Sequence, residues 1–265
     1  MEQRPRAMDD HITAAGVFLR DAERVVVLTG AGISAESGVP TFRGAGGLWK
    51  SYRAEDLATP EAFARDARLV WEWYGWRREL VAACEPNAAH HAIARAAQER
   101  PAFRVVTQNV DGLHAAASAP GGPRPLELHG SLFRTRCTRC GARWDDRQSV
   151  DATSTATLPH CAECGSLARP DVVWFGEALD SAVFAEAVQL ASAADVCLVV
   201  GTSAVVYPAA GLADMTRRAG GRVIEVNIAE TPLTGAATIA IRGTAVGIIP
   251  ALLPVATEPT PKVYG

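Results

Sequence analysis

The stretch "VVVLTGAGISAESGVPTFRG", residues 25–44, decides the fold, because it joins a buried strand to a glycine-rich turn. The apolar run at residues 25–28 leads directly into Gly30-Ala31-Gly32, as in the first turn of a dinucleotide-binding domain. A dehydrogenase would continue into a helix, whereas this chain runs into Ser37-Gly38-Val39-Pro40, which a helix tolerates poorly. A tight turn that holds no ligand is the alternative interpretation of the glycines.

Apolar segments of the same kind recur along the chain. Five short runs that end in polar loops are predicted as strands: residues 24–30, 103–109, 195–201, 222–227 and 238–243. Three alanine-rich stretches are predicted as helices: residues 87–100, 181–193 and 209–219. Because strands and helices alternate, we expect an α/β fold with a doubly wound, Rossmann-like parallel sheet, whose ligands bind beyond the carboxyl ends of the strands.

Two segments do not fit this alternation and are expected to form a smaller module over the strand ends. They are a helical, tryptophan-rich insertion at residues 45–85 and a cysteine-bearing insertion at residues 134–173. The remaining residues, 1–44, 86–133 and 174–256, are predicted to form the large, NAD-binding domain. The proline-rich tail at residues 257–265 is expected to be flexible.

Composition narrows the class of protein. The chain has 265 residues, of which 48% are hydrophobic and 21% charged, and a net charge of −3, as in ordinary globular proteins. Without a basic excess, no specific nucleic-acid partner is expected. No apolar run approaches the ~20 residues of a membrane helix, and the N-terminus lacks the apolar core of a secretion signal. The sequence therefore predicts a cytoplasmic protein without a membrane partner.

Four of the six cysteines form two Cys-x-x-Cys pairs: Cys137, Cys140, Cys161 and Cys164. In a reducing compartment such pairs are typical of zinc sites, and four protein thiolates leave no position for substrate, so we expect one structural Zn²⁺. Glycine follows the second cysteine of each pair, where a tight turn is needed. Cys84 and Cys197 are expected to be small core residues. A nucleic-acid-binding zinc ribbon is disfavoured, because the nearby arginines are mixed with aspartates.

Polar side chains gather at one predicted strand end in "TQNVDGLH", residues 107–114. Gln108, Asn109 and Asp111 are typical of a carboxamide and ribose recognition loop, although an asparagine–aspartate turn would use the same residues. His129, in "ELHGSLF", ends a short extended segment. Its imidazole suits proton abstraction near neutral pH, and a structural histidine is the alternative.

Taken together, these motifs resemble the sirtuin family. The resemblance is carried by residues 30–44, "TQNVDGLH", "LHG", the cysteine pairs, "RPDVVWFGE" at 169–177, "GTS" at 201–203 and "VN" at 226–227, in order and spacing over residues 20–250. It implies NAD-dependent removal of acyl groups from protein lysines, with nicotinamide and O-acyl-ADP-ribose as products. Such an enzyme cleaves the nicotinamide–ribose bond, so the segment after the glycine turn is expected to be a mobile lid.

The resemblance also implies roles for individual residues. His129 matches the general base. The residues that match NAD⁺ contacts are Gly30, Ala31, Gly32, Glu36, Phe42, Arg43, Gln108, Asn109, Asp111, Gly201, Thr202, Ser203, Asn227 and Ala245. Contacts to an acyl-lysine protein or peptide are implied for Val172, Trp174, Phe175 and Gly176.

The stretch "WEWYGWRREL", residues 71–80, bears on which acyl group is removed. Tyr74 and Arg77 lie three residues apart on a predicted helix and share one face. By themselves they could be a solvated arginine and an amphipathic tyrosine. They resemble, however, the pair that marks the desuccinylase and demalonylase branch of sirtuins, where both hold the distal carboxylate of the acyl group. Ala58 matches a position whose small side chain leaves room for a longer acyl group.

Two other activities remain open from the sequence. An ADP-ribosyltransferase would share every cofactor motif and differ only in where the ADP-ribose goes. A hydride-transfer dehydrogenase is the weakest alternative, because no acidic residue ends a second strand after Gly32.

Overall fold

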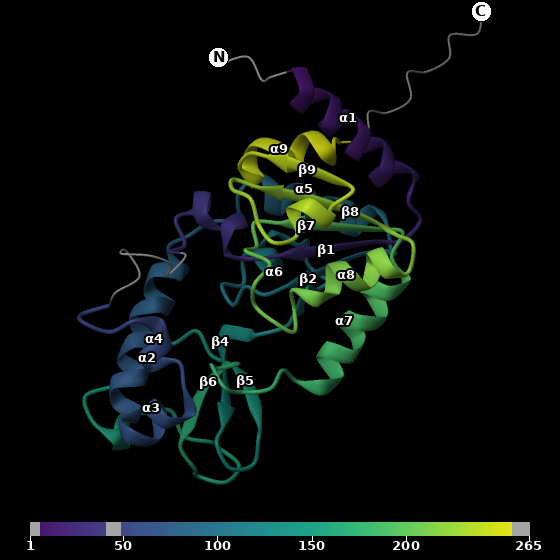
Figure 1. The fold of residues 1–265 in the computed structure, drawn as a ribbon. Helices are drawn as coiled ribbons and strands as arrows, with labels where there is room; N and C mark the ends of the chain where they lie inside the picture. The colour runs from purple at the N-terminus through teal and green to yellow at the C-terminus, as the bar shows by residue number, and fades with distance from the viewer. Residues whose placement is uncertain (1–5, 41–48, 256–265) are drawn as a thin grey trace, which may run out of the picture.

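A six-stranded parallel sheet organises the computed structural model, which describes residues 6–40 and 49–255 (Figure 1). The strand order is β3-β2-β1-β7-β8-β9. The strands are β1 (Val25–Thr29), β2 (Phe103–Thr107), β3 (Leu126–Glu127), β7 (Val196–Val200), β8 (Arg222–Asn227) and β9 (Ile239–Arg242). The predicted doubly wound fold is confirmed. β2 is shorter than expected, since its ladder with β1 ends at Thr107 and leaves Gln108 and Asn109 in the loop.

Helices cover both faces of this sheet. They are α1 (Arg6–Asp21), α5 (Ala88–Glu99), α6 (Leu113–Ala117), α7 (Ser181–Ala193), α8 (Gly211–Arg218) and α9 (Ala245–Leu252). The sequence pattern predicts α5, α7 and α8 to within two residues at most ends, but neither α1 nor α9 was expected. The apolar sequence of α9 lacks a polar face because this helix packs against both α1 and α5.

Alternate residues of β1 bury against different helix layers. Val25 and Val27 pack in the cluster that contains residues of α1, α5 and α9, whereas Val26 and Leu28 pack in the cluster that contains residues of α7 and α8. Burying each such side chain stabilises the fold by about 1.5–3 kcal/mol. This two-sided burial explains why the run is continuously apolar and marks β1 as a central strand.

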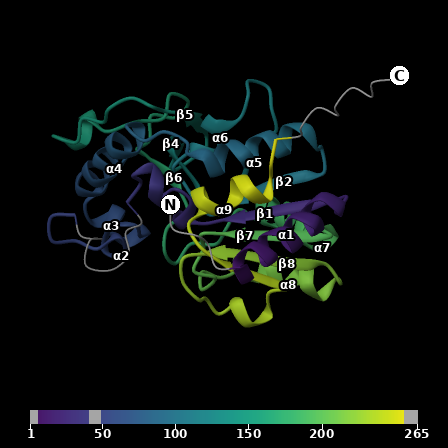
Figure 2. The same ribbon diagram turned by 90° about the horizontal axis from the view of Figure 1, so that it is seen from above.

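Beyond the carboxyl ends of the strands lies a smaller group of elements. It contains α2 (Ala54–Leu57), α3 (Pro60–Arg65) and α4 (Ala67–Ala82), and an antiparallel sheet of order β5-β4-β6. Its strands are β4 (Gly130–Cys137), β5 (Arg143–Asp145) and β6 (Ala168–Val172). Both views place the helices and this sheet side by side, and they share one apolar cluster (Figures 1 and 2). This second sheet does not follow from the sequence pattern, and the segment boundary expected at residue 134 falls inside β4.

Capping residues explain why α3 and α4 are separate helices. Thr59 Oγ1 accepts the backbone N–H of Ala62 at 3.1 Å, with Pro60 in the first helical position. Seven residues after Thr59, Asp66 Oδ1 accepts the N–H of Leu69 at 3.0 Å and starts the second helix. Short polar side chains of this kind satisfy the free N–H groups of a helix start.

Among residues 6–40 and 49–255, no helix has both the length and the apolar character needed to span a membrane.

A buried arginine joins α4 to the antiparallel sheet. Arg78 is 5% exposed, and its Nε donates to the carbonyl oxygen of Leu132 at 2.6 Å. Its Nη1 pairs with Asp146 Oδ2 at 3.2 Å, and its Nη2 donates to Thr135 Oγ1 at 3.0 Å. All three partners lie on or directly after β4 and β5. A cation buried in this way is stabilising only while its partners are present.

We expect Arg78→Met to destabilise the protein by about 3–5 kcal/mol, because the buried carboxylate of Asp146 loses its cation. Urea unfolding followed by tryptophan fluorescence measures this loss. Arg68→Met, an exposed position on the same helix, is the matched control and should change the free energy of unfolding by less than about 0.5 kcal/mol. Equal effects of the two substitutions would contradict the anchoring role of Arg78.

Candidate functional site

The loops after β1 and β7 touch at the topological switch point of the sheet. The chain proceeds from β1 to β2 on one side and returns to β7 on the other, so a crevice opens between these two loops. The backbone N–H of Gly32 donates to the carbonyl oxygen of Gly201 at 2.7 Å. A Cβ at Gly30 would lie 2.8 Å from Thr202 Cβ, and one at Gly32 would lie 2.7 Å from that carbonyl oxygen. Glycine is therefore required at both positions.

No regular helix follows this turn. Two single-turn 3₁₀ helices, Ala31–Ile33 and Ala35–Ser37, take its place, and the second ends at Gly38 with φ of 89°. The interrupted helix predicted from residues 37–40 is thus present. Phe42 and Arg43, which were predicted to contact the cofactor, lie outside the described residues.

A cavity of about 450 Å³ opens beside the two loops. Eight residues predicted to contact NAD⁺ line it: Ala31, Gly32, Glu36, Gly201, Thr202, Ser203, Asn227 and Ala245. Ser203 Oγ is buried, and in the part of the chain that the structure describes it has no hydrogen-bond partner. Asn227 Nδ2 donates to the carbonyl oxygen of Thr202 at 2.7 Å and fixes the far wall. An unmatched buried hydroxyl suits a ligand rich in oxygen acceptors, such as a pyrophosphate.

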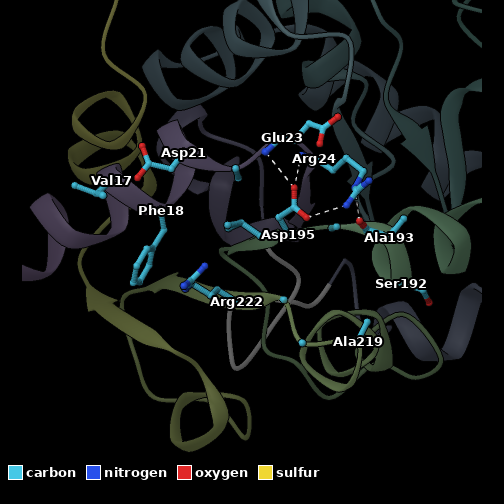
Figure 3. A pocket seen from close by; sticks show the side chains of 15 residues that line it. Val17, Phe18, Asp21, Glu23, Arg24, Ser192, Ala193, Asp195, Ala219 and Arg222 are labelled. Atoms are coloured by element: carbon cyan, nitrogen blue, oxygen red, sulfur yellow. Dashed lines mark hydrogen bonds and ion pairs between the residues drawn. The ribbon is translucent and has the colours of Figure 1, made fainter.

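A second cavity, of about 850 Å³, lies at the amino ends of the strands β1, β7 and β8 (Figure 3). Its lining includes Phe18, Arg24, Asp195 and Arg222. Asp195 accepts the backbone N–H of Arg24 at 2.8 Å and pairs with its guanidinium at 3.0 Å, which ties the starts of β1 and β7 together. None of the residues predicted for the functional site lines this cavity, so we do not assign it a role in the function.

Next to the glycine loops, a serine links the polar residues at the end of β2. Ser34 Oγ donates to Asp111 Oδ2 at 2.7 Å and accepts from Asn109 Nδ2 at 3.1 Å. Gln108 Nε2 donates to Thr202 Oγ1 at 3.1 Å. Gln108, Asn109 and Asp111 therefore all contact the loops that follow β1 and β7. Burial raises the pKa of the Asp111 carboxyl, against hydrogen bonds from Leu113 and Ser34.

Sequence reasoning missed Ser34 and its neighbour His90. His90 Nε2 lies 3.4 Å from Ser34 Oγ, and burial lowers the pKa of this histidine to about 4, so it is neutral at physiological pH. Ser34 stands inside the glycine motif and could have been noticed as its hydroxyl residue. No local signal marks His90, which reaches the site only through the packing of α5.

His129 is held where β4 begins. Its Nδ1 lies 2.9 Å from the carbonyl oxygen of Gln108, which can only accept, so Nδ1 carries the proton and Nε2 has the free lone pair. Burial lowers the pKa of His129, and the bond to Gln108 opposes this shift. The imidazole is therefore neutral near pH 7 and able to accept a proton. Gly130 has φ of 81°, and a side chain there would collide with Asp171, which explains the glycine in "LHG".

The residues predicted to contact an acyl-lysine are brought together from two insertions. Ala58, Tyr74, Val172 and Trp174 pack in one apolar cluster. Tyr74 and Arg77 do share a face of α4, with the guanidinium carbon 5.5 Å from the phenol ring centroid. Phe175 follows Trp174 in the chain, and its backbone N–H donates to the carbonyl oxygen of Ala58 at 2.9 Å. This bond joins the segment after β6 to the end of α2.

Past this cluster the chain turns outward. Phe175 is 54% exposed and Gly176 has φ of 83°, so this loop presents both its backbone and an aromatic side chain to solvent.

Of the two cysteines expected in the core, Cys197 is fully buried, whereas Cys84 is only half-buried because it follows the end of α4.

The four paired cysteines converge as predicted. Their Sγ atoms all lie within 4.8 Å of one another, and three of the separations are 3.4, 3.6 and 3.7 Å. Tetrahedral zinc with Zn–S bonds of about 2.3 Å needs sulfur atoms about 3.8 Å apart, so the four thiolates fit this ion. Gly141 and Gly165, with φ of 75° and 70°, make the tight turns after each pair. Backbone N–H groups of Arg139 and Cys140 point at Cys137 Sγ and lower the pKa of this thiol.

Comparison with known proteins shows the family. A model of the Sir2 family matches residues 30–208. NAD-dependent protein deacylase 2 of Pyrobaculum aerophilum is 50% identical over 236 residues, which cover 89% of this chain and 92% of that protein.

Solved structures agree with this match. A Sir2 homologue in complex with NAD has a TM-score of 0.83 and 43% identity, covering 96% of this chain and 95% of that one. A Sir2–p53 peptide–NAD⁺ complex has a TM-score of 0.77 and 31% identity, covering 93% of this chain and 96% of that one. The chain therefore belongs to the Sir2 family, the sirtuins, and the resemblance drawn from its motifs is confirmed at the level of the family.

Metal analysis tests the cysteine cluster. We expect one zinc ion per chain, and we expect Cys161→Ser to lose it, because a hydroxyl replaces one of four thiolate ligands. Elemental analysis of the purified protein gives the metal content, and thermal unfolding gives the stability. Cys84→Ser, at a cysteine outside the cluster, is the control and should retain the zinc. A stable wild-type protein without zinc would contradict the assignment.

Proposed function

We propose that this chain is an NAD-dependent protein-lysine deacylase that removes succinyl and malonyl groups in preference to acetyl. Family membership supports the deacylase activity, since related sirtuins carry that name and a related structure holds both a peptide and NAD⁺. The acyl preference rests on one observation, the pairing of Tyr74 and Arg77 inside the apolar cluster next to Ala58. In this proposal the large domain holds NAD⁺ and the two insertions hold the acyl group.

The cavity of about 450 Å³ is the proposed site for the adenosine and phosphate part of NAD⁺. The hydroxyl of Ser203 is suited to a phosphate oxygen, and Asn227 is suited to a ribose. Gln108, Asn109 and Asp111 are proposed to hold the nicotinamide end, where a carboxamide needs both a donor and an acceptor. When bound, NAD⁺ supplies an electrophilic ribose carbon for the acyl oxygen to attack.

His129 is the proposed general base. Its Nδ1–H is donated to Gln108, which keeps the ring oriented and leaves Nε2 to take a proton from a ribose hydroxyl. Because burial lowers its pKa, the ring stays in the basic form at neutral pH. Asp111 does not compete for this role, since its carboxylate is already bonded to Ser34 and to the N–H of Leu113.

Arg77 is the proposed acyl-specificity residue. Burial lowers the pKa of its guanidinium, which means that the surroundings disfavour the charge and would favour a carboxylate brought beside it. A succinyl or malonyl group ends in such a carboxylate, whereas an acetyl group does not. A planar guanidinium can hold a carboxylate with two parallel hydrogen bonds.

The base is tested by His129→Ala and His129→Tyr. We expect deacylation to fall by about 10²–10⁴-fold, because a general base contributes that much, while NAD⁺ binding stays near wild type. Product formation by mass spectrometry and NAD⁺ affinity by calorimetry give the two readouts. His91→Ala, an exposed histidine on α5, is the control. Near wild-type turnover in the His129 variants would contradict the role of His129 as general base. Transfer of labelled ADP-ribose to protein would indicate a transferase instead.

The acyl preference is tested by Arg77→Met. We expect kcat/KM for a succinyl-lysine peptide to fall about 10- to 150-fold, since a hydrogen bond to a charged group contributes about 1.5–3 kcal/mol. Turnover of the matching acetyl-lysine peptide should stay level or rise. The exposed Arg68→Met serves as the control on the same helix. If both activities fall together, Arg77 serves the fold and the preference for acidic acyl groups is wrong.

A further inference from the structure

The phenol oxygen of Tyr74 accepts a hydrogen bond from Trp174, and the guanidinium of Arg77 lies beside the phenol ring. Trp174 Nε1 donates to the phenol oxygen at 2.9 Å in a buried contact. The guanidinium carbon of Arg77 lies 5.5 Å from the centroid of the phenol ring, and the interaction with Tyr74 opposes the lowering of the pKa of Arg77 by burial. An indole N–H and a guanidinium can donate but cannot accept. Towards either group, the Tyr74 hydroxyl can therefore act only as an acceptor.

This arrangement determines where the proton of Tyr74 points. A tyrosine hydroxyl has two acceptor lone pairs and one proton to donate, and the neighbouring donors Trp174 and Arg77 can meet only its lone pairs. Burial raises the pKa of Tyr74, so the hydroxyl keeps its proton at neutral pH. Within residues 6–40 and 49–255, no hydrogen bond has this hydroxyl as its donor. A fully buried hydroxyl that donates to nothing in the described part of the chain is suited to an acceptor from a ligand.

Trp174 cannot easily turn away from this contact. The guanidinium carbon of Arg169 lies 3.2 Å from the indole centroid, and the ring of Phe63 lies 5.3 Å from it. Arg169 is itself paired with Glu177 at 2.5 Å, and Glu177 Oε2 accepts the backbone N–H of Trp174 at 2.8 Å. The side chain is only 3% exposed. Backbone and ring are thus held on several sides, and the indole N–H has a defined direction.

We infer that Trp174 is a positioning residue for acyl recognition: its indole N–H occupies the Tyr74 oxygen and directs the phenol proton to the distal carboxylate of the acyl group. This inference rests on the proposed preference for acidic acyl groups and adds a residue to it. The sequence alone assigned Trp174 a direct contact with substrate. With the indole N–H already donated to Tyr74, it acts through that tyrosine.

A double-mutant cycle tests the inference. Trp174→Phe keeps an aromatic ring and removes the N–H, and Tyr74→Phe removes the hydroxyl. The readout is the ratio of kcat/KM for succinyl-lysine and acetyl-lysine versions of one peptide. We expect Trp174→Phe to lower this ratio about 3- to 10-fold, mainly through KM, as the loss of one oriented hydrogen bond predicts. In the Tyr74→Phe background the same substitution should change the ratio less than about twofold.

Trp71→Phe is the matched control. Trp71 is also fully buried on α4, and its Nε1 donates to the carbonyl oxygen of Ala168 at 2.9 Å, so the substitution removes an equivalent hydrogen bond away from Tyr74. It should leave the ratio unchanged. Should Trp174→Phe not fold, 3-benzothienylalanine at position 174 replaces the N–H by sulfur in a ring of the same shape.

The outcomes separate the two proposals. A wild-type enzyme that does not prefer succinyl-lysine overturns the proposed acyl preference and this inference with it. A succinyl-preferring enzyme in which Trp174→Phe lowers the ratio equally with and without the Tyr74 hydroxyl overturns the inference alone. An effect of Trp71→Phe as large as that of Trp174→Phe also overturns it, because general loosening would then be the cause.

Discussion

The contact between the backbones of Gly32 and Gly201 is the constraint on which the rest of the site depends. Two loops that follow neighbouring strands approach so closely that no Cβ can stand between them. This approach brings Thr202 to Gln108 and, from the other side, to Asn227. The crevice therefore has walls of glycine backbone and small polar side chains, in loops that the adjacent strands hold in place.

A second constraint lies where the two sheets of the molecule meet. His129 ends one segment and Gly130 begins β4, while the backbone N–H of Val173 donates to the carbonyl oxygen of His129 at 2.9 Å. The imidazole thus stands at the junction between the crevice and the smaller group of elements. Its orientation is determined from the crevice side by Gln108, and its backbone is held from the other side by the segment after β6. In our proposal, this position lets His129 act on NAD⁺ in the crevice while the smaller group of elements holds the acyl group.

Charge is used differently in two parts of the smaller group. Arg78 and Arg169 are buried, but each meets a carboxylate at close range, Asp146 and Glu177. Such pairs hold elements together and lose their benefit only when one partner is removed. Burial lowers the pKa of Arg77 as it lowers that of Arg78, but the groups that oppose this shift at Arg77 are the phenol of Tyr74 and, less strongly, Asp111. In our proposal this difference separates an arginine for substrate from arginines for structure.

How much the sequence by itself determined depended on the range of the interactions. Strands such as Val25–Thr29 and the cysteine pairs were predictable, because burial on both faces and metal ligation leave patterns within a few residues. The glycine turn was recognisable for the same reason, and the family followed from the order of such motifs. The antiparallel sheet, the link from His90 to Ser34 and the bond from Trp174 to Tyr74 were not predictable. The two side-chain links join positions 56 and 100 residues apart in the chain, and only tertiary packing decides which distant polar groups meet.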